Sequence, residues 1–329
     1  MKKILIIRFS SIGDIVLTTT VVRCLKKQLP GAEIYYLTKP EYKTILENNP
    51  YIDHLHVLDK PLIQKSLELR KIGFDCIIDL HRNFRTKVIK TIIGTKNHIY
   101  DKLNFEKWLM VNFKINMLPK LHIVDRYMET VATLGVVNDG DGLNYFINEN
   151  DFSQAFMETF HEMSLQGKKY IAFAIGAHHF TKKLPDEKII SICKLINKPV
   201  VLLGGKEDKI KGDEIANRSG SHVTNLCGTL SLNESAYMLR QSEKVITHDT
   251  GLMHIAAAFQ KEIISVWGNT IPEFGMTPYY GKSDTVHSTF EIQNLACRPC
   301  SKIGFDQCPK GHFNCMMMQN ENAIASPAF

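Results

Sequence analysis

The sequence predicts an α/β fold built from two doubly wound, Rossmann-like domains. Short apolar segments alternate with segments of helical periodicity along most of the 329 residues, which is typical of parallel sheets. The length fits two domains of ordinary size. A stretch over 137–151, rich in Asn, Asp and Gly, separates the two halves. We therefore expect one domain over residues 1–145 and a second over 146–329.

The composition is that of an ordinary globular protein, with 44% hydrophobic and 22% charged residues. A net charge of +6 fits an anionic ligand or an anionic membrane surface. No block of Lys and Arg with interleaved aromatic residues is present, so nucleic acid is not an expected partner. The apolar run at residues 4–7 stops at Arg8 and is too short for a signal peptide. We expect a cytoplasmic protein that can touch the inner membrane peripherally.

The first half begins with an apolar strand over residues 3–7. The loop 8–14 follows and leads into a helix whose apolar residues are spaced by four and which ends at Pro30-Gly31. A loop in this place lies at the carboxyl end of a strand, where open α/β sheets bind ligands. The dinucleotide fingerprint G-x-G-x-x-G is absent from it. Further strands are expected over 33–38, 54–58 and 74–80, and helices over 41–47, 62–72, 86–93, 105–112 and 123–134.

The second half repeats this scheme. Strands are expected over 169–175, 199–203, 223–226, 244–247 and 263–267, and the last of these is the final clear strand of the chain. Helices are expected over 186–196, after 208, and over 232–241. The tail after Met318 is expected to be poorly ordered.

The stretch 247–270 carries the clearest functional pattern. Asp249 and Thr250 are good helix N-cap residues, and Gly251 lets a ligand or backbone approach closely. The apolar residues of the following helix recur at i, i+3, i+4 and i+7, and His254 lies off that face, in the first turn. Free N–H groups, a hydroxyl and an imidazole would converge where an anion binds. The alternative is that Asp249 only caps the helix and His254 lies on the surface.

Five segments, in order along the chain, together resemble glycosyltransferase family 9, the heptosyltransferases that build the inner core of lipopolysaccharide. The segments are R-F-S-S-I-G-D-I-V-L-T-T (8–19), K-K-L-P (182–185), L-L-G-G-K-E-D (202–208), H-D-T-G-L-M-H-I-A-A-A (248–258) and V-W-G-N-T (266–270). The resemblance implies a fold of the GT-B type, in which two Rossmann-like domains face each other across a cleft. It also implies that the first domain binds the acceptor and the second binds the nucleotide-sugar.

Two catalytic residues follow from the resemblance together with the chemistry of an inverting sugar transfer. Such a transfer needs a carboxylate to take the proton from the acceptor hydroxyl and cations to stabilise the departing diphosphate. Asp14 matches the base, although a carboxylate at that place also suits a helix N-terminus. Lys182 matches the lysine that reaches the donor phosphates, because the family has it three residues before the proline. Lys183 is its neighbour, and a loop lysine is otherwise simply solvated.

The resemblance also implies the two binding sites. The donor would be an ADP-sugar, ADP-heptose in the family, bound without a required metal cofactor. Its expected contacts are Glu207 with the ribose, Leu230 with the adenine, and Asp249, Thr250, Gly251 and His254 with the diphosphate. The acceptor would be an anionic glycolipid at the inner membrane surface, of the Kdo–lipid A type. Its expected contacts are Ser10, Ser11, Gly13, Arg82 and Arg85, and for the two arginines a solvated basic face is an equal alternative.

Four cysteines near the C-terminus have the pattern C-x2-C-x7-C-x6-C: Cys297, Cys300, Cys308 and Cys315. Four thiolates could hold a tetrahedral structural zinc ion, with His312 as a spare ligand, but the second pair lacks the spacing of a zinc knuckle. Disulfides are disfavoured in a reducing cytoplasm.

Three functional hypotheses remain open from the sequence. The leading one is an inverting, metal-independent heptosyltransferase. The second is an enzyme with another nucleotide-sugar or acceptor, or a nucleotide-sugar epimerase or hydrolase, on the same fold. The third is a non-enzymatic nucleotide-binding protein, which the joint presence of Asp14, Lys182 and His254 disfavours.

Overall fold

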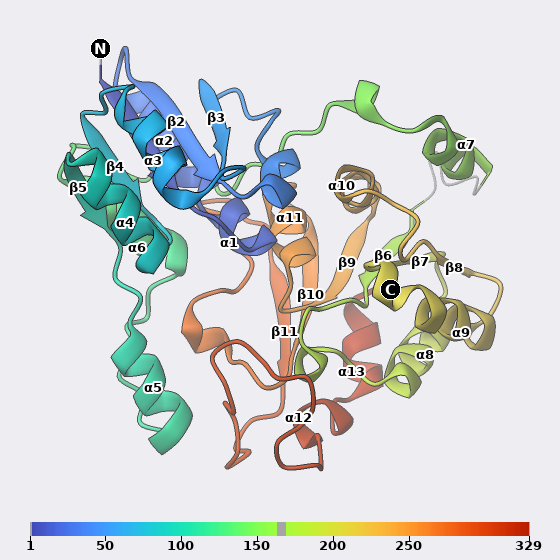
Figure 1. Cartoon of the computed structure of the whole chain (residues 1–329). Coiled ribbons are helices and arrows are strands. Elements are labelled where there is room, and N and C mark those ends of the chain that lie inside the picture. Colours follow the sequence, from blue (N-terminus) through green and yellow to red (C-terminus); the bar gives the residue numbers. More distant parts are fainter. Residues whose placement is uncertain (1, 163–168, 329) are drawn as a thin grey trace. The chain divides into compact units, whose positions relative to one another are not determined.

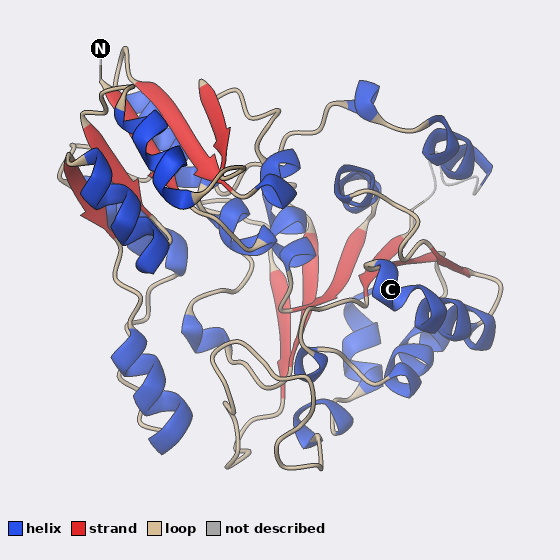
Figure 2. Ribbon diagram, viewed as in Figure 1, coloured by secondary structure: helices blue, strands red, loops and turns tan. Residues whose placement is uncertain are grey.

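Two parallel β-sheets, each covered by helices, carry the fold of the computed structural model, which describes residues 2–162 and 169–328 (Figures 1 and 2). The backbone divides into two units. The first comprises Met1–Lys102, Leu121–Phe146 and Tyr279–Ser283, and the second comprises Leu103–Lys120, Ile147–Pro278 and Asp284–Phe329. The predicted α/β fold class with two doubly wound parallel sheets is confirmed.

The sheet of the first unit has the strand order β3-β2-β1-β4-β5, and all its strands are parallel. Its strands are β1 (Lys3–Ile7), β2 (Glu33–Thr38), β3 (His54–Val57), β4 (Cys76–Asp79) and β5 (Lys96–Ile99). Its helices are α1 (Ile12–Leu17), α2 (Thr19–Gln28), α3 (Leu62–Arg70), α4 (Phe84–Ile93) and α6 (Ile123–Ala132), with a 3₁₀ helix at Pro40–Ile45. The chain order reverses between β1 and β4, so the loops after these two strands lie at the switch point where such sheets bind ligands.

The sheet of the second unit has the order β11-β10-β9-β6-β7-β8, again all parallel. Its strands are β6 (Ile171–Ala174), β7 (Val200–Leu203), β8 (Val223–Asn225), β9 (Lys244–His248), β10 (Glu262–Trp267) and β11 (His287–Glu291). Its helices are α5 (Asn104–Phe113), α7 (Gln154–Glu162), α8 (Asp186–Leu195), α9 (Lys209–Ser219), α10 (Leu232–Gln241), α11 (Gly251–Ala258), α12 (Asn314–Met317) and α13 (Glu321–Ala325). Here the switch point lies between β6 and β9.

Several sequence expectations about the fold are wrong. Residues 12–29 form two helices rather than one, because the chain breaks at Thr18, whose hydroxyl hydrogen-bonds to the Ile15 carbonyl oxygen and to the hydroxyl of Tyr36. The strand at 263–267 is not the last, since β11 pairs with β10 beyond it. The tail after Met318 is ordered, because α13 packs its apolar side chains against α8 and Lys188 holds Glu321 at 2.9 Å.

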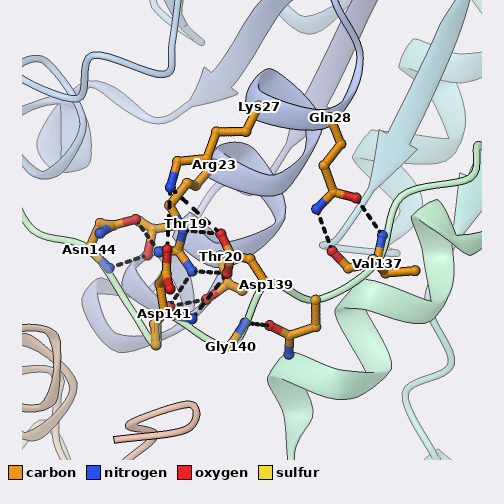
Figure 3. Close-up of polar contacts among 12 residues, drawn as sticks. Thr19, Thr20, Arg23, Lys27, Gln28, Val137, Asp139, Gly140, Asp141 and Asn144 are labelled. Atoms are coloured by element: carbon orange, nitrogen blue, oxygen red, sulfur yellow. Dashed lines mark hydrogen bonds and ion pairs between the residues drawn. The ribbon is translucent and has the colours of Figure 1, made fainter.

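The turn-rich stretch 137–144 is tied to α2 by the buried side chain of Arg23 (Figure 3). The guanidinium donates to both carboxylate oxygens of Asp139, at 2.8 and 2.6 Å, to the Gly142 carbonyl oxygen at 2.9 Å, and to the side chain of Asn144. The Thr20 hydroxyl donates to the same Gly142 oxygen at 2.7 Å. A stretch that looks like a loose linker in the sequence is therefore fixed within the first unit.

Replacing Arg23 by Met is expected to lower the free energy of unfolding by about 3–5 kcal/mol, because it removes one partner of a buried ion pair. Urea unfolding of the purified variant measures this loss. The matched control is Lys27→Met on the same helix, since the Lys27 side chain is nearly half exposed and contacts Asp141 at 3.3 Å; the expected loss there is about 1 kcal/mol or less. Equal losses in the two variants would contradict the role given to Arg23.

The same ion pair makes stability depend on pH. The hydrogen bond from Arg23 is the largest cause that lowers the pKa of Asp139, from 3.8 to about 2. Because the pKa is lower in the folded chain, the stabilisation is complete above the unfolded pKa and is lost as the pH falls from about 4 towards 2. The Arg23→Met variant should lose less stability over this window than the unchanged chain.

Candidate functional site

Asp14 lies in the first turn of α1, directly after the loop that follows β1. Its Oδ2 accepts hydrogen bonds from the backbone N–H of Ser11 at 3.3 Å and from the Ser11 hydroxyl at 3.0 Å. Its Oδ1 contacts the guanidinium of Arg8 at 2.6 Å. The side chain is about one fifth exposed, so a ligand can reach a carboxylate that is already oriented on both sides.

Arg8, which was not among the predicted site residues, orients Asp14. Its buried guanidinium also donates to the Ser10 carbonyl oxygen at 2.8 Å, to the Leu80 carbonyl oxygen and to the Tyr127 hydroxyl at 3.0 Å. Burial alone would lower the pKa of Arg8, but Asp14 and the tyrosine hydroxyls more than offset this and raise it. Arg8 is thus a permanent cation that joins the loops after β1 and β4. Its place directly after the central strand, in the R-F-S-S-I-G-D segment, is the signal that could have identified it.

His81 is a second group that the sequence did not single out. It follows β4, and its ring lies 5.0 Å from that of Phe9. Burial, and then the charge of Arg8, lowers the pKa of His81 to about 4. It is therefore a neutral imidazole at physiological pH, next to the loop that carries Asp14.

The residues predicted to bind an acceptor divide into two groups. Ser10, Ser11 and Gly13 share the loop and first turn that hold Asp14. Arg82 and Arg85 follow β4, the strand next to β1, and both are exposed. The Arg82 guanidinium contacts Asp101 at 2.9 Å, so one predicted acceptor cation already has a carboxylate partner.

In the second unit, Lys182 and Asp249 form an ion pair at the switch point of the sheet. Lys182 lies in the loop after β6, and its Nζ contacts Asp249 Oδ2 at 2.6 Å and the Asp249 carbonyl oxygen at 3.3 Å. The Thr270 hydroxyl donates to the same Oδ2 at 2.9 Å. Three of the five motif segments therefore meet at one carboxylate. The N-cap of the following helix is Thr250, so the expectation that Asp249 caps this helix is wrong.

Lys183 points to a different carboxylate. Its Nζ contacts Oδ1 of the buried Asp208 at 2.6 Å, and Oδ2 accepts from the Gly205 N–H at 3.0 Å. A Cβ atom on Gly176 would lie 2.3 Å from Asp208 Oδ2, so the glycine leaves room for this carboxylate. Lys183 thus holds the loop in place, which leaves Lys182 as the lysine directed at Asp249. A cavity of about 290 Å³ borders Lys183 and Asp208 but has none of the predicted site residues in its walls.

His248, the last residue of β9, holds the same loop from the other side. Its ring is fully buried, and Nε2 accepts the backbone N–H of Leu184 at 3.0 Å. Burial, and then the charge of Lys183, lowers the pKa of His248 to about 3, so the ring is neutral. This contact could not be predicted from the sequence, because it joins residues 64 positions apart.

Helix α11 begins after the N-cap residue Thr250, as predicted, but the Thr250 side chain makes no cap hydrogen bond. His254 is 2% exposed, so the alternative that placed it on the surface is wrong. The single apolar face was also an incomplete prediction, since Met253 is fully buried and Leu252 only half-buried. The reason is that α11 packs against β9, β10 and α10 and is covered on most sides.

Glu207 and Leu230 follow β7 and β8. Glu207 is exposed in a short 3₁₀ helix, and its carboxylate folds back to within 2.4 Å of where a Cβ on Gly205 would stand. Leu230 is half-buried just before the N-cap Ser231 of α10. All the predicted donor residues thus follow strands of one sheet at their carboxyl ends, where such sheets bind nucleotides.

The C-terminal cysteines are free thiols. Cys297 Sγ lies 3.8 Å from His312 Nε2, and Cys300 Sγ donates to the Cys297 carbonyl oxygen at 2.9 Å. Burial, and then the neighbouring cysteines, raise the pKa of Cys300 to about 11 and of Cys315, where burial again leads, to about 12. Within residues 2–162 and 169–328, no three His, Cys, Asp or Glu side chains are grouped to hold a metal ion. The zinc hypothesis stays a prediction without a formed ligand set.

Comparison with known proteins identifies one family. The family model for glycosyltransferase family 9 (heptosyltransferase) matches residues 64–303. Lipopolysaccharide heptosyltransferase 1 of Campylobacter coli is 27% identical over 291 residues, which cover 82% of this chain and 84% of that protein.

Solved structures show the same fold. The family 9 glycosyl transferase of Veillonella parvula superposes with a TM-score of 0.77 at 22% identity, over 99% of this chain and 96% of that one. The E. coli ADP-heptose lps heptosyltransferase II superposes with a TM-score of 0.67 at 21% identity, over 99% of both chains.

Proposed function

Because the chain belongs to glycosyltransferase family 9, the heptosyltransferase family, we propose that it moves heptose from ADP-heptose to a lipopolysaccharide inner-core acceptor of the Kdo–lipid A type. The chain is a glycosyltransferase, and its relatives act in heptosyl transfer to lipopolysaccharide. The observation that carries the proposal is the pair Lys182–Asp249 beside the N-terminus of α11. It offers a cation and backbone N–H groups together, which suits a diphosphate.

Asp14 acts as the general base in this proposal. It takes the proton from the acceptor hydroxyl while the oxygen attacks the anomeric carbon of the donor, the bond from that carbon to the β-phosphate oxygen breaks, and ADP leaves with the electron pair. Attack from the side opposite the leaving group inverts the anomeric centre. Arg8 keeps the carboxylate in place through its contact with Asp14 Oδ1 at 2.6 Å.

The second unit stabilises the leaving group. Lys182 contacts the diphosphate while Asp249 fixes its ammonium, and the α11 N-terminus at Thr250 and Gly251 donates N–H groups. His254 adds a donor from the first turn. These groups supply positive charge where negative charge develops, so the transfer needs no divalent metal. Glu207 accepts the ribose hydroxyls, and Leu230 packs on the adenine.

A transfer assay tests this function. The purified protein, ADP-heptose and a Kdo–lipid A acceptor are mixed in buffer containing EDTA. We expect release of ADP that requires both substrates, because the proposed mechanism uses no metal. Change of the donor without an acceptor would instead reveal an epimerase or a hydrolase. Failure of ADP-sugars to raise the melting temperature, with GDP- or UDP-sugars raising it, would overturn the donor assignment.

Two further expectations belong with this proposal. The reaction takes place at the cytoplasmic face of the inner membrane, where an anionic glycolipid acceptor would be found. The four C-terminal cysteines remain a candidate for structural zinc, which metal analysis of protein purified without added zinc decides.

A further inference from the structure

The segment Leu103–Lys120 carries an unusual surface. Helix α5, labelled in Figure 1, lies in this segment, and none of its ten residues is buried. Phe105, Trp108, Phe113, Ile115 and Met117 are between 51% and 63% exposed. Single exposed apolar residues are normal, but five large ones within thirteen positions form a patch that marks an interaction site.

Contacts within the second unit hold the segment by its lysines and leave its apolar side chains outside. Lys107 Nζ lies 6.0 Å from the ring centroid of Phe274, and Lys114 Nζ donates to the Pro299 carbonyl oxygen at 2.7 Å. The aromatic rings contact one another instead of a core, with the Trp108 ring 6.3 Å from Phe105 and 5.2 Å from Phe113. The patch is therefore preformed and faces outward.

The charge of the segment favours one kind of partner. Leu103–Lys120 contains three lysines against one glutamate, and Asp101-Lys102 precede it. Lys107 and Lys114 contact the second unit, whereas Lys120 is exposed at the end of the segment. Aromatic and aliphatic side chains beside lysines are the pattern of a helix that lies in the interface of an anionic bilayer. A ten-residue helix is about 15 Å long, too short to cross a bilayer. Across the described residues, no helix combines the length and apolar character that a membrane span requires.

We propose that Leu103–Lys120 docks this protein on an anionic lipid surface, with Phe105, Trp108 and Phe113 entering the headgroup layer. The inference deepens the proposed function, on which it rests for the presence of a membrane-bound acceptor. A second copy of the chain is the competing occupant. An isologous dimer would bring the lysines of two copies together in one apolar interface, which is unfavourable.

Tryptophan fluorescence tests the proposal directly. The chain has two tryptophans, and Trp267 is buried at 1% exposure, so a change in emission on adding vesicles reports Trp108. We expect phosphatidylglycerol vesicles to shift the emission to the blue and to protect it from iodide, and phosphatidylcholine vesicles to do so much less. High salt should weaken the effect. Unchanged emission with anionic vesicles, or the same blue shift from raising protein concentration alone, would overturn the proposal.

Variants separate docking from folding and from catalysis. Phe105→Glu/Trp108→Glu should reduce co-sedimentation with anionic vesicles at least about tenfold, and Lys120→Glu about tenfold. Ile210→Glu, at an exposed apolar residue of α9, is the matched control and should bind normally. Because α5 buries no side chain, the double variant should keep its melting temperature and its turnover of a detergent-dispersed acceptor.

Vesicle binding is measured without any substrate, so failure of the proposed transfer and failure of docking are distinguishable. Normal vesicle binding by the double variant would refute the docking role.

Discussion

Asp14→Asn is expected to slow heptosyl transfer by about 10²–10⁴-fold, the usual contribution of a general base, while leaving ADP binding unchanged. The amide has the shape of the carboxylate but cannot take a proton from the acceptor hydroxyl. Donor binding is spared because the expected donor contacts lie in the second unit. Initial rates of ADP release and calorimetric titration with ADP measure the two effects separately.

The variant also removes the charge that faces Arg8, so its folding has to be checked. Arg8 keeps its hydrogen bonds to the Ser10 and Leu80 carbonyl oxygens and to Tyr127, which limits the loss. Asp14→Glu is the companion variant, because it retains the charge and displaces the oxygens. Asp59→Asn, at an exposed carboxylate paired with Lys65 at 3.0 Å, is the control. A folded Asp14→Asn protein with a normal rate would exclude Asp14 as the base.

Lys182→Met is expected to weaken ADP binding and to lower kcat by about 10²–10³-fold. The substitution removes the cation nearest the expected diphosphate. It also leaves the Asp249 carboxylate, at 2.6 Å from Lys182 Nζ in the intact chain, with a neutral hydroxyl from Thr270 as its remaining side-chain partner, so an anionic ligand meets repulsion. Steady-state kinetics and ADP titration measure both effects.

The neighbouring lysine provides an internal comparison. Lys183→Met leaves Asp208 buried without its cation, so we expect a loss of about 3–5 kcal/mol in stability. The turnover of the molecules that remain folded should fall much less than in Lys182→Met. The opposite result, a stable Lys183→Met protein without activity beside an active Lys182→Met protein, would show that the two lysines have been assigned in the wrong order.

Elements with a regular apolar pattern were predictable from the sequence. The strand at 33–38 and the helix at 232–241 have the bounds expected from the sequence. Two edge strands were missed because they lack such a pattern. In β5, three of the four residues are exposed, and β11 pairs on one side only, so neither shows the apolar run of a buried strand. The helix expected at 41–47 forms instead as the 3₁₀ helix Pro40–Ile45, which begins at a proline.

The position of the candidate site was more predictable than its contacts. Loops after strands of a parallel sheet gather at one edge, and this was enough to group the motif segments. The pairs Arg8–Asp14, Lys182–Asp249 and Lys183–Asp208 were not foreseen, because the last two join residues 67 and 25 positions apart. Such contacts depend on which strands become neighbours and in which register. The burial of His254 was missed because helical periodicity predicts a helix that packs on one face only. Helix α11 instead packs against α10, β9 and β10.

Lys182 and Lys183, in the segment after β6, contact two different carboxylates, and this limits changes in the length of that segment. Lys182 is the last residue of the 3₁₀ helix Phe180–Lys182, and Lys183 follows it in an extended conformation, so the two side chains leave the backbone in different directions. Gaining or losing a single residue ahead of Lys182 would displace both ammonium groups from their carboxylates and leave Asp208 buried without its cation. Length variation is thus closed to this loop, and new sugar preferences would have to arise by substitution within it or by remodelling other connections, such as the long one at 268–283.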